Sequence, residues 1–423
     1  MRWPHTVGIT TTIHGFDAEP GKTRNLLLLA VATLFSLSLW FSGSAVIPQV
    51  TEAWELVSWQ QSWLTMGVQV GFVVGALVSS LLILADRIPT RWFLAGSALM
   101  GAIFNGLIAI AVDSFEPALI LRVLTGVCMA GVYPPGMKLV ATWCLRDRGF
   151  GIGVLVGALT IGSGLPHLLN VIPELFTEST AVEWKSVLLI ASGLALLGSA
   201  IAALFVRQGP HLTAATKFNW RFAMRGLSDP PCRLANFGYF GHMWELYAMW
   251  AWVPLMLIAS YSQAGIEPIL ARIAGFGVVA IGSVGCLIAG WMADRLGRTQ
   301  VISGSLIISG ICAAVIGFSF SNPVLLTAIA LIWGLTVIAD SAQFSAAVTE
   351  LSDPRYVGTA LTVQTSLGFL LTLVSIHAVP KVQAVLGWEG AFLILVLGPA
   401  FGLWSMVALR RLPDVRRIDS GRH

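Results

Sequence analysis

The sequence predicts an all-α integral membrane protein with twelve transmembrane helices in two pseudo-symmetric halves of six. Hydrophobic residues make up 56% of the chain and charged residues 11%, against about 25% charged in soluble globular proteins. Twelve apolar runs are long enough to cross a hydrocarbon core of about 30 Å. A charged turn after the second run recurs after the eighth at an offset of 208 positions, which carries Asp86 onto Asp294.

The twelve apolar runs divide the chain into segments. The runs cover approximately residues 25–47, 62–84, 92–112, 118–142, 149–171, 185–206, 235–259, 270–292, 299–319, 324–347, 357–379 and 389–409. We therefore expect a tail at 1–24, one six-helix half at 25–206, a central loop at 207–234, a second half at 235–409 and a basic tail at 410–423. The first tail is polar and lacks the apolar core of a signal peptide.

Basic residues predict the orientation. With both termini cytoplasmic, most of the 25 Lys and Arg fall in the tails and inner loops, and the outer loops are acidic instead. This is the positive-inside pattern of a multi-pass protein of the cell membrane. It also accounts for the formal net charge of +4, so no nucleic-acid partner is indicated.

The repeated inner turn is the best-defined motif. Its second copy contains Gly290, Asp294, Arg295, Gly297 and Arg298, and its degraded first copy contains Asp86, Arg87 and Arg91. An acid at the inner end of a helix can pair with a neighbouring Arg or with the positive N-terminus of the next helix, and so latch one of two helix packings. The alternative is a solvated turn that only follows the positive-inside pattern.

Twelve spans in two halves, a long central loop and this turn resemble the major facilitator superfamily over about residues 25–410. The resemblance implies two six-helix halves and a central cavity lined by the first, fourth, seventh and tenth spans. In the first copy of the motif, Leu82 and Ile88-Pro89-Thr90 depart from the family pattern.

The fourth span carries Arg122, Tyr133 and the pair Pro134-Pro135. Its Arg-x-x-x-Gly resembles a second superfamily motif, and the Tyr-Pro-x-Gly that follows loosely resembles the organic anion:cation symporters and the nitrate/nitrite porter group. A buried arginine is costly in lipid, so Arg122 should face the cavity, a carboxylate or a carbonyl. The alternative is a snorkelling arginine with a structural partner. The two prolines predict a kink just below Tyr133.

The seventh span is the least lipid-like. Tyr239, His242, Glu245, Met249 and Trp252 recur at helical spacing and share one face. Glu245 lies near the midplane, where a carboxylate must be neutral, paired or hydrated, and a neighbouring His242 can relay a proton near neutral pH. The alternative is a structural His–Glu pair that ties this helix to a neighbour.

The tenth span adds Asp340, with Gln343 on the same face. The resemblance would bring these residues into one cavity with Tyr239, His242 and Glu245 of the seventh span. The expected cavity residues are Arg122, Tyr133, Tyr239, Trp40, Ser44, Gln69, Trp252 and Gln343, and the expected proton-coupling residues are Glu245, His242 and Asp340.

These features predict a secondary active transporter with alternating access, and not an enzyme. No phosphate-binding loop, metal site or cofactor motif appears. We expect proton-coupled symport of a small polar or anionic organic solute, in which Glu245 carries the proton, His242 tunes it and Arg122 holds substrate charge or the opposite gate. The alternatives are a drug/proton antiporter for cationic amphiphiles and a non-transporting receptor on the same fold. The expected partners are the solute, the proton and membrane lipid, with the chain as a monomer.

Overall fold

The computed structural model describes residues 19–144, 148–171, 184–211, 226–353 and 356–421, and every regular element in them is helical. The first group comprises α1 (Lys22–Leu37), α2 (Ser42–Ala45), α3 (Ile47–Trp54), α4 (Ser58–Leu82), α5 (Leu84–Arg87), α6 (Thr90–Ala111), α7 (Phe115–Met129), α8 (Tyr133–Trp143), α9 (Arg148–Leu169) and α11 (Trp184–Leu204). The second comprises α13 (Pro230–Gln263), α14 (Pro268–Ala280), α15 (Gly282–Leu296), α16 (Arg298–Val315), η1 (Ile316–Ser319), α17 (Pro323–Val337), α18 (Ser341–Leu351), α19 (Val357–Gly390), η3 (Leu393–Val396), α20 (Leu397–Arg410) and η4 (Pro413–Gly421).

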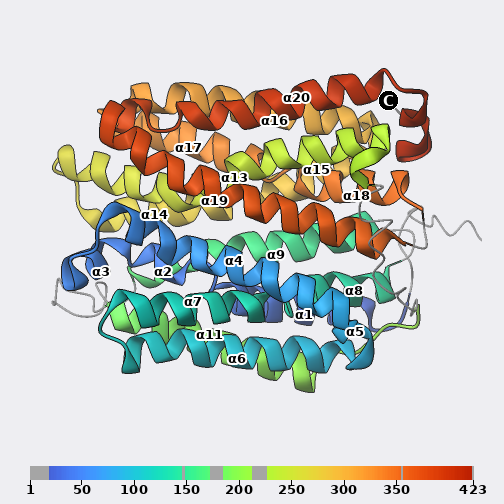
Figure 1. Ribbon diagram of the computed structural model, residues 1–423, viewed down its shortest axis with the longest axis horizontal. Coiled ribbons are helices and arrows are strands. Elements are labelled where there is room, and N and C mark those ends of the chain that lie inside the picture. The colour runs from blue at the N-terminus through green and yellow to red at the C-terminus, as the bar shows by residue number, and fades with distance from the viewer. Residues whose placement is uncertain (1–18, 145–147, 172–183, 212–225, 354–355, 422–423) are drawn as a thin grey trace, which may run out of the picture.

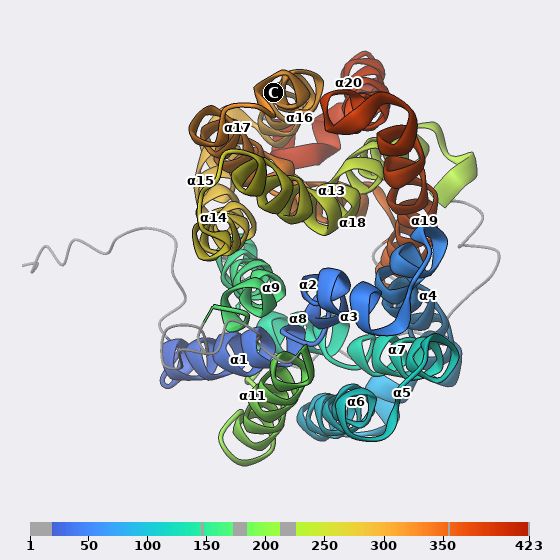
Figure 2. The same cartoon turned by 90° about the vertical axis from the view of Figure 1, so that its left-hand side faces the viewer.

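The two groups form two bundles that lie side by side (Figures 1 and 2). Helices suit this chain because lipid offers no hydrogen-bond partner to an open backbone. Across the interface between the bundles, α4 packs against α19, and α9 packs against α14 and α15. The ends of α5, α8 and α18 and the C-terminus lie at the same end of the molecule, which the positive-inside pattern predicts to be the cytoplasmic, inner end.

Ten helices in the described residues are long and apolar enough to cross a membrane. The two predicted spans missing from that set have identifiable causes. The first span is broken into α1, α2 and α3, so no single piece is long enough, and the seventh span, α13, is rich in polar and aromatic residues. With these two added, the helices account for the twelve predicted spans.

Helix bounds in the fourth and tenth spans also repeat at the offset of 208 positions. The fourth span breaks between α7 and α8, and the tenth breaks in the same way between α17 and α18; both helix starts, Phe115 and Pro323, and both second starts, Tyr133 and Ser341, are 208 residues apart. The fourth span bends at residues 130–132, before Tyr133 and not below it as the sequence predicts. A helix tolerates proline in its first turn, so Pro134 and Pro135 begin the new helix and the bend precedes them.

The repeated glycines are points of backbone contact. A methyl group on Gly126 would overlap the carbonyl oxygen of Val68, and one on Gly334 would overlap the carbonyl oxygen of Val278. Both glycines therefore let the fourth or tenth span touch the backbone of the preceding even-numbered span. Small residues at such crossings are the usual means of close helix packing in membranes.

We expect the Gly334→Ala variant to lose stability by roughly 1–3 kcal/mol, because the added methyl group must push α17 away from the α14 backbone. Thermal unfolding of the purified protein in detergent measures this loss. The matched control is Gly304→Ala in α16, where nothing lies within 4 Å of an added methyl group. Equal melting temperatures for the two variants would contradict the backbone contact.

The first tail and the central loop can be compared with the structure only in part. The central loop was expected to reach residue 234, but α13 begins at Pro230, again with proline in the first turn. Residues 1–18 of the first tail and 212–225 of the central loop lie outside the described residues. The C-terminal tail packs on the inner end of the second bundle through buried Ile418 and through Arg417, whose Nη2 donates to the carbonyl of Leu351.

Candidate functional site

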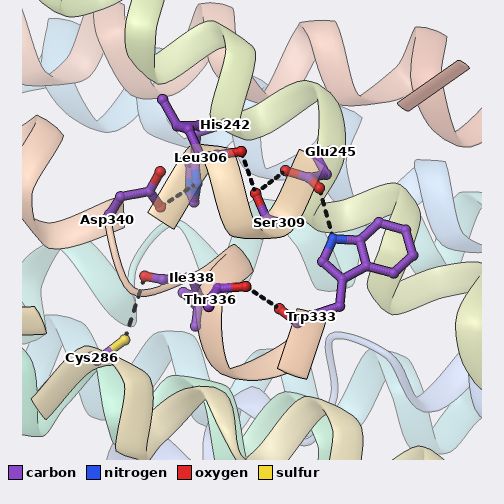
Figure 3. Close-up of polar contacts among 9 residues, drawn as sticks. All are labelled: His242, Glu245, Cys286, Leu306, Ser309, Trp333, Thr336, Ile338 and Asp340. Carbon is purple, nitrogen blue, oxygen red and sulfur yellow. Dashed lines mark hydrogen bonds and ion pairs between the residues drawn. The ribbon is translucent and has the colours of Figure 1, made fainter. Parts of the chain in front are cut away.

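A buried ionisable pair lies at the break in the tenth span. His242 of α13 and Asp340, in the turn between α17 and α18, bring Nδ1 and Oδ1 to 2.8 Å, and both residues are 1% exposed (Figure 3). The contact does not have the geometry of a linear hydrogen bond, and it is an ion pair when His242 is protonated. The second ring nitrogen, Nε2, has no hydrogen-bond partner among the described residues. The rings of Tyr239 and Phe344 lie against His242, with centroids 5.8 Å away.

Glu245 points in a different direction from His242. Its Oε1 accepts from Trp333 Nε1 of α17 at 2.7 Å, and its Oε2 accepts from Ser309 Oγ of α16 at 3.0 Å. The carboxylate thus joins the seventh, ninth and tenth spans inside the second bundle. The two acids of the site therefore have separate partners, and the structure shows no hydrogen bond between His242 and Glu245.

Arg122 of α7 is buried inside the first bundle. Its guanidinium donates to the carbonyls of Leu39, Trp40 and Leu64 and to Ser42 and Asn105, at 2.6–3.2 Å. Leu39 and Trp40 lie in the break between α1 and α2, where backbone carbonyls lack intrahelical partners. Of the three expected orientations, the guanidinium therefore takes the one toward carbonyls, and it is 1% exposed.

An aromatic layer joins the two bundles near the middle of the spans. It consists of Trp40 and Phe72 from the first bundle and Tyr247 and Phe369 from the second. Trp40 contacts the other three rings at centroid distances of 5.1–5.8 Å, and Phe72 and Phe369 lie 4.6 Å apart. All four side chains are buried. Since the rings come from both bundles, relative motion of the bundles must separate them.

Some of the other predicted cavity residues have side chains without a hydrogen-bond partner among the described residues, and others are bonded. Gln69 is fully buried, and neither of its amide atoms has a partner among the described residues; the same is true of Trp40 Nε1. Ser44 bonds Thr65 at 2.6 Å, and Trp252 donates to the carbonyl of Ile376 at 2.9 Å. Trp252 thus fastens α13 to α19, whereas Tyr133 is half-buried at the start of α8.

The inner turn after the eighth span contacts α18 near both of its ends. Arg298 donates to Gln343 Oε1 at 2.7 Å and pairs with Glu350 Oε1 at 2.9 Å. Gln343, predicted for the cavity wall, thus contributes its carbonyl oxygen to this turn. Arg295 lies over the ring of Trp291 at 3.8 Å. The side chains of Asp86 and Asp294 lie outside the described part of the chain, so the predicted pairing of these acids stays a prediction.

Three residues that matter in these contacts were not predicted from the sequence. Asn105 and Ser309 complete the buried networks of Arg122 and Glu245. Gln364 of α19 is 1% exposed and has two amide atoms without a partner among the described residues. A polar residue within an apolar span is the only signal in the sequence that points to any of the three.

Comparison with known proteins places the chain in a family. The model of the Major Facilitator Superfamily matches residues 28–376. The chain belongs to this superfamily of membrane transporters, and it is not an enzyme.

Two relatives resemble the chain at low identity. The gallate transporter of Pseudomonas putida is 26% identical over 341 residues, 71% of this chain and 73% of the relative. The 4-hydroxybenzoate transporter PcaK of Acinetobacter baylyi is 24% identical over 302 residues, 63% of this chain and 64% of that relative. The second match thus takes in slightly less than two thirds of its relative.

Proposed function

We propose that this protein is a secondary active transporter that carries a small aromatic carboxylate by proton-coupled symport. The observation that supports this most is the buried His242–Asp340 pair, which lies at a helix break. An ionisable pair at such depth is costly, and in membrane transporters it commonly marks the path of an ion or a substrate. The names of the two relatives agree with an aromatic acid as substrate.

In this proposal His242 binds the carboxylate of the substrate. Asp340 contacts Nδ1 and stabilises the protonated ring, so Nε2 is left as a donor. A carboxylate at Nε2 receives a charge-assisted hydrogen bond, which is stronger than a neutral one. Arg122 is a weaker candidate for this role because five hydrogen bonds already engage its guanidinium. Its charge acts at longer range and holds the break in the first span.

The ring of the substrate packs against aromatic side chains between the bundles. Tyr247 belongs to the aromatic layer and follows His242 by five residues, about 7.5 Å along α13. Offset and edge-to-face ring contacts of this kind favour a planar aromatic solute over an aliphatic one. Gln69, Trp40, Tyr133 and Tyr239 complete the proposed wall. Ser44 bonds Thr65, which lies four residues before Gln69 on α4.

The coupling proton resides on the acids and the histidine of the second bundle. Binding of an anion at His242 favours the protonated ring. Substrate and proton therefore bind together and cross the membrane in the same direction, which is symport. The two bundles then rock about this site, separating the aromatic layer and exchanging the contacts of Arg298 at the inner end. Glu245, bonded only by neutral donors, is the second candidate for holding the proton.

Uptake into proteoliposomes tests the substrate and the coupling together. We expect labelled 4-hydroxybenzoate to accumulate when the outside is acidic and to stop accumulating when a protonophore removes the gradient. Accumulation of an aliphatic acid of similar charge should be at least about tenfold weaker, because it lacks the ring contacts.

Two other results would redirect the assignment. Acid-inside vesicles that take up a cationic dye in exchange for protons would identify a drug/proton antiporter. Binding of an aromatic acid, measured by thermal shift, without flux of any solute would indicate a receptor. Accumulation that persists with the protonophore contradicts proton coupling alone.

A further inference from the structure

Gln364 is a buried amide on the surface of α19 that meets α13. The residue is 1% exposed, and neither Oε1 nor Nε2 has a hydrogen bond among the described residues. Gly368, one turn further on the same face, packs so closely that an added methyl group would lie 2.5 Å from the ring of Tyr239. Tyr239 in turn contacts His242. Gln364 therefore faces the part of α13 that carries the proposed carboxylate site.

The position of Gln364 relative to the aromatic layer distinguishes it from Gln69. Phe72 of α4 and Phe369 of α19 touch at 4.6 Å, and the two helices run in opposite directions (Figure 1). Gln69 precedes Phe72 and Gln364 precedes Phe369, so the two amides lie on opposite sides of the layer. Only Gln364 lies on the side of His242.

An unpaired amide in a dry interior is unfavourable, because its donors and its acceptor were bonded to water before burial. The amide offers both a donor and an acceptor, and a hydroxyl group complements both. An amine cation or a second carboxylate would satisfy only one of the two. A hydroxyl group on the substrate is therefore the partner that fits this side chain best.

We propose that Gln364 is a specificity-determining residue that recognises a ring hydroxyl group of the substrate, so that the protein prefers hydroxylated aromatic acids to benzoate. This inference rests on the proposed function, since it assumes an aromatic carboxylate held at His242. A site built to bond a hydroxyl group discriminates strongly against the analogue without one, because its own polar group is then left unpaired.

Competing uptake of 4-hydroxybenzoate and benzoate by the full-length protein in proteoliposomes tests the proposal. The Gln364→Met variant keeps the size of the side chain and removes the amide. We expect its KM for 4-hydroxybenzoate to rise about tenfold while its KM for benzoate changes less than about twofold. The matched control is Gln343→Met, which removes an amide already bonded to Arg298 and should change both substrates alike.

Each result has a defined meaning. A preference that is the same in Gln364→Met and the wild type overturns the inference, as does an equal loss for both acids, which marks a structural role. If the wild type transports neither acid, the proposed function fails and the inference fails with it. If the wild type transports both acids but the variant leaves their ratio unchanged, the inference alone fails.

Discussion

We expect the Asp340→Asn variant to lose proton-driven accumulation of substrate and to keep the exchange of labelled for unlabelled substrate across the membrane. Asparagine cannot change charge, and it cannot stabilise a protonated His242. Protonation then no longer favours one state of the carrier over the other, so the accumulation ratio falls to about one. Uptake under an imposed pH gradient, compared with counterflow in the same vesicles, separates the two activities.

The control for this substitution is Asp113→Asn at the outer end. Asp113 pairs with Lys185 at 3.5 Å, and its side chain is 87% exposed, so we expect coupling to remain. Glu245→Gln is the informative third variant. If it keeps full coupling, Glu245 has only a structural role and the proton belongs to the His242–Asp340 pair. Full accumulation by Asp340→Asn itself would contradict the assignment of that pair to coupling.

The Arg122→Met variant is expected to lose folded protein and transport together. Methionine removes all five hydrogen bonds that the Arg122 guanidinium donates. The carbonyl of Trp40 loses its side-chain donor, whereas the carbonyl of Leu39 still accepts from Ser42 Oγ. A hydrogen bond to a charged group is worth about 1.5–3 kcal/mol, so the loss of this network is expected to cost on the order of several kcal/mol. Arg122→Lys restores only part of this, because one ammonium group cannot reach three helices with the geometry of a guanidinium.

Thermal unfolding in detergent and the yield of monodisperse protein measure this effect. Arg411→Met, at an exposed position after α20, removes the same charge without disturbing a buried network and should behave as the wild type. An Arg122→Met protein that melts at the wild-type temperature would show that the break in the first span needs no buried cation.

Helical periodicity predicted which residues share a face, but not what that face meets. His242 and Asp340 were expected in one cavity, and the structure brings them into contact. Glu245 lies on the same side of α13, and yet its partners are Ser309 and Trp333 within the bundle. The direction of a side chain within a broad face depends on the crossing of neighbouring helices, which a single sequence does not encode locally.

The family resemblance and the repeat predicted the architecture well for a physical reason. Apolar length is dictated by the membrane, and backbone contacts at Gly126 and Gly334 require the smallest residue at matching places in both halves. Gln343 illustrates the opposite case. It shares a helix face with Asp340, but its side-chain oxygen accepts a hydrogen bond from Arg298 of another helix. The amide of Gln364 has no hydrogen-bond partner among the described residues, and this can be learned only from the positions of its neighbours in the fold.

The matched breaks in the fourth and tenth spans are not equivalent in chemistry. Pro134 and Pro135 lack backbone N–H donors just after the first break, so the two helical hydrogen bonds that these donors would make across the break cannot form. The second break contains Ile338, Ala339 and Asp340, which retain every backbone N–H. The backbone at this second break can therefore re-form helical hydrogen bonds. In the structure the bend is held by side chains, among them Cys286, whose Sγ donates to the carbonyl of Ile338. The break in the first bundle is therefore fixed by proline, whereas the break in the second bundle can straighten, and it contains the ionisable residue Asp340.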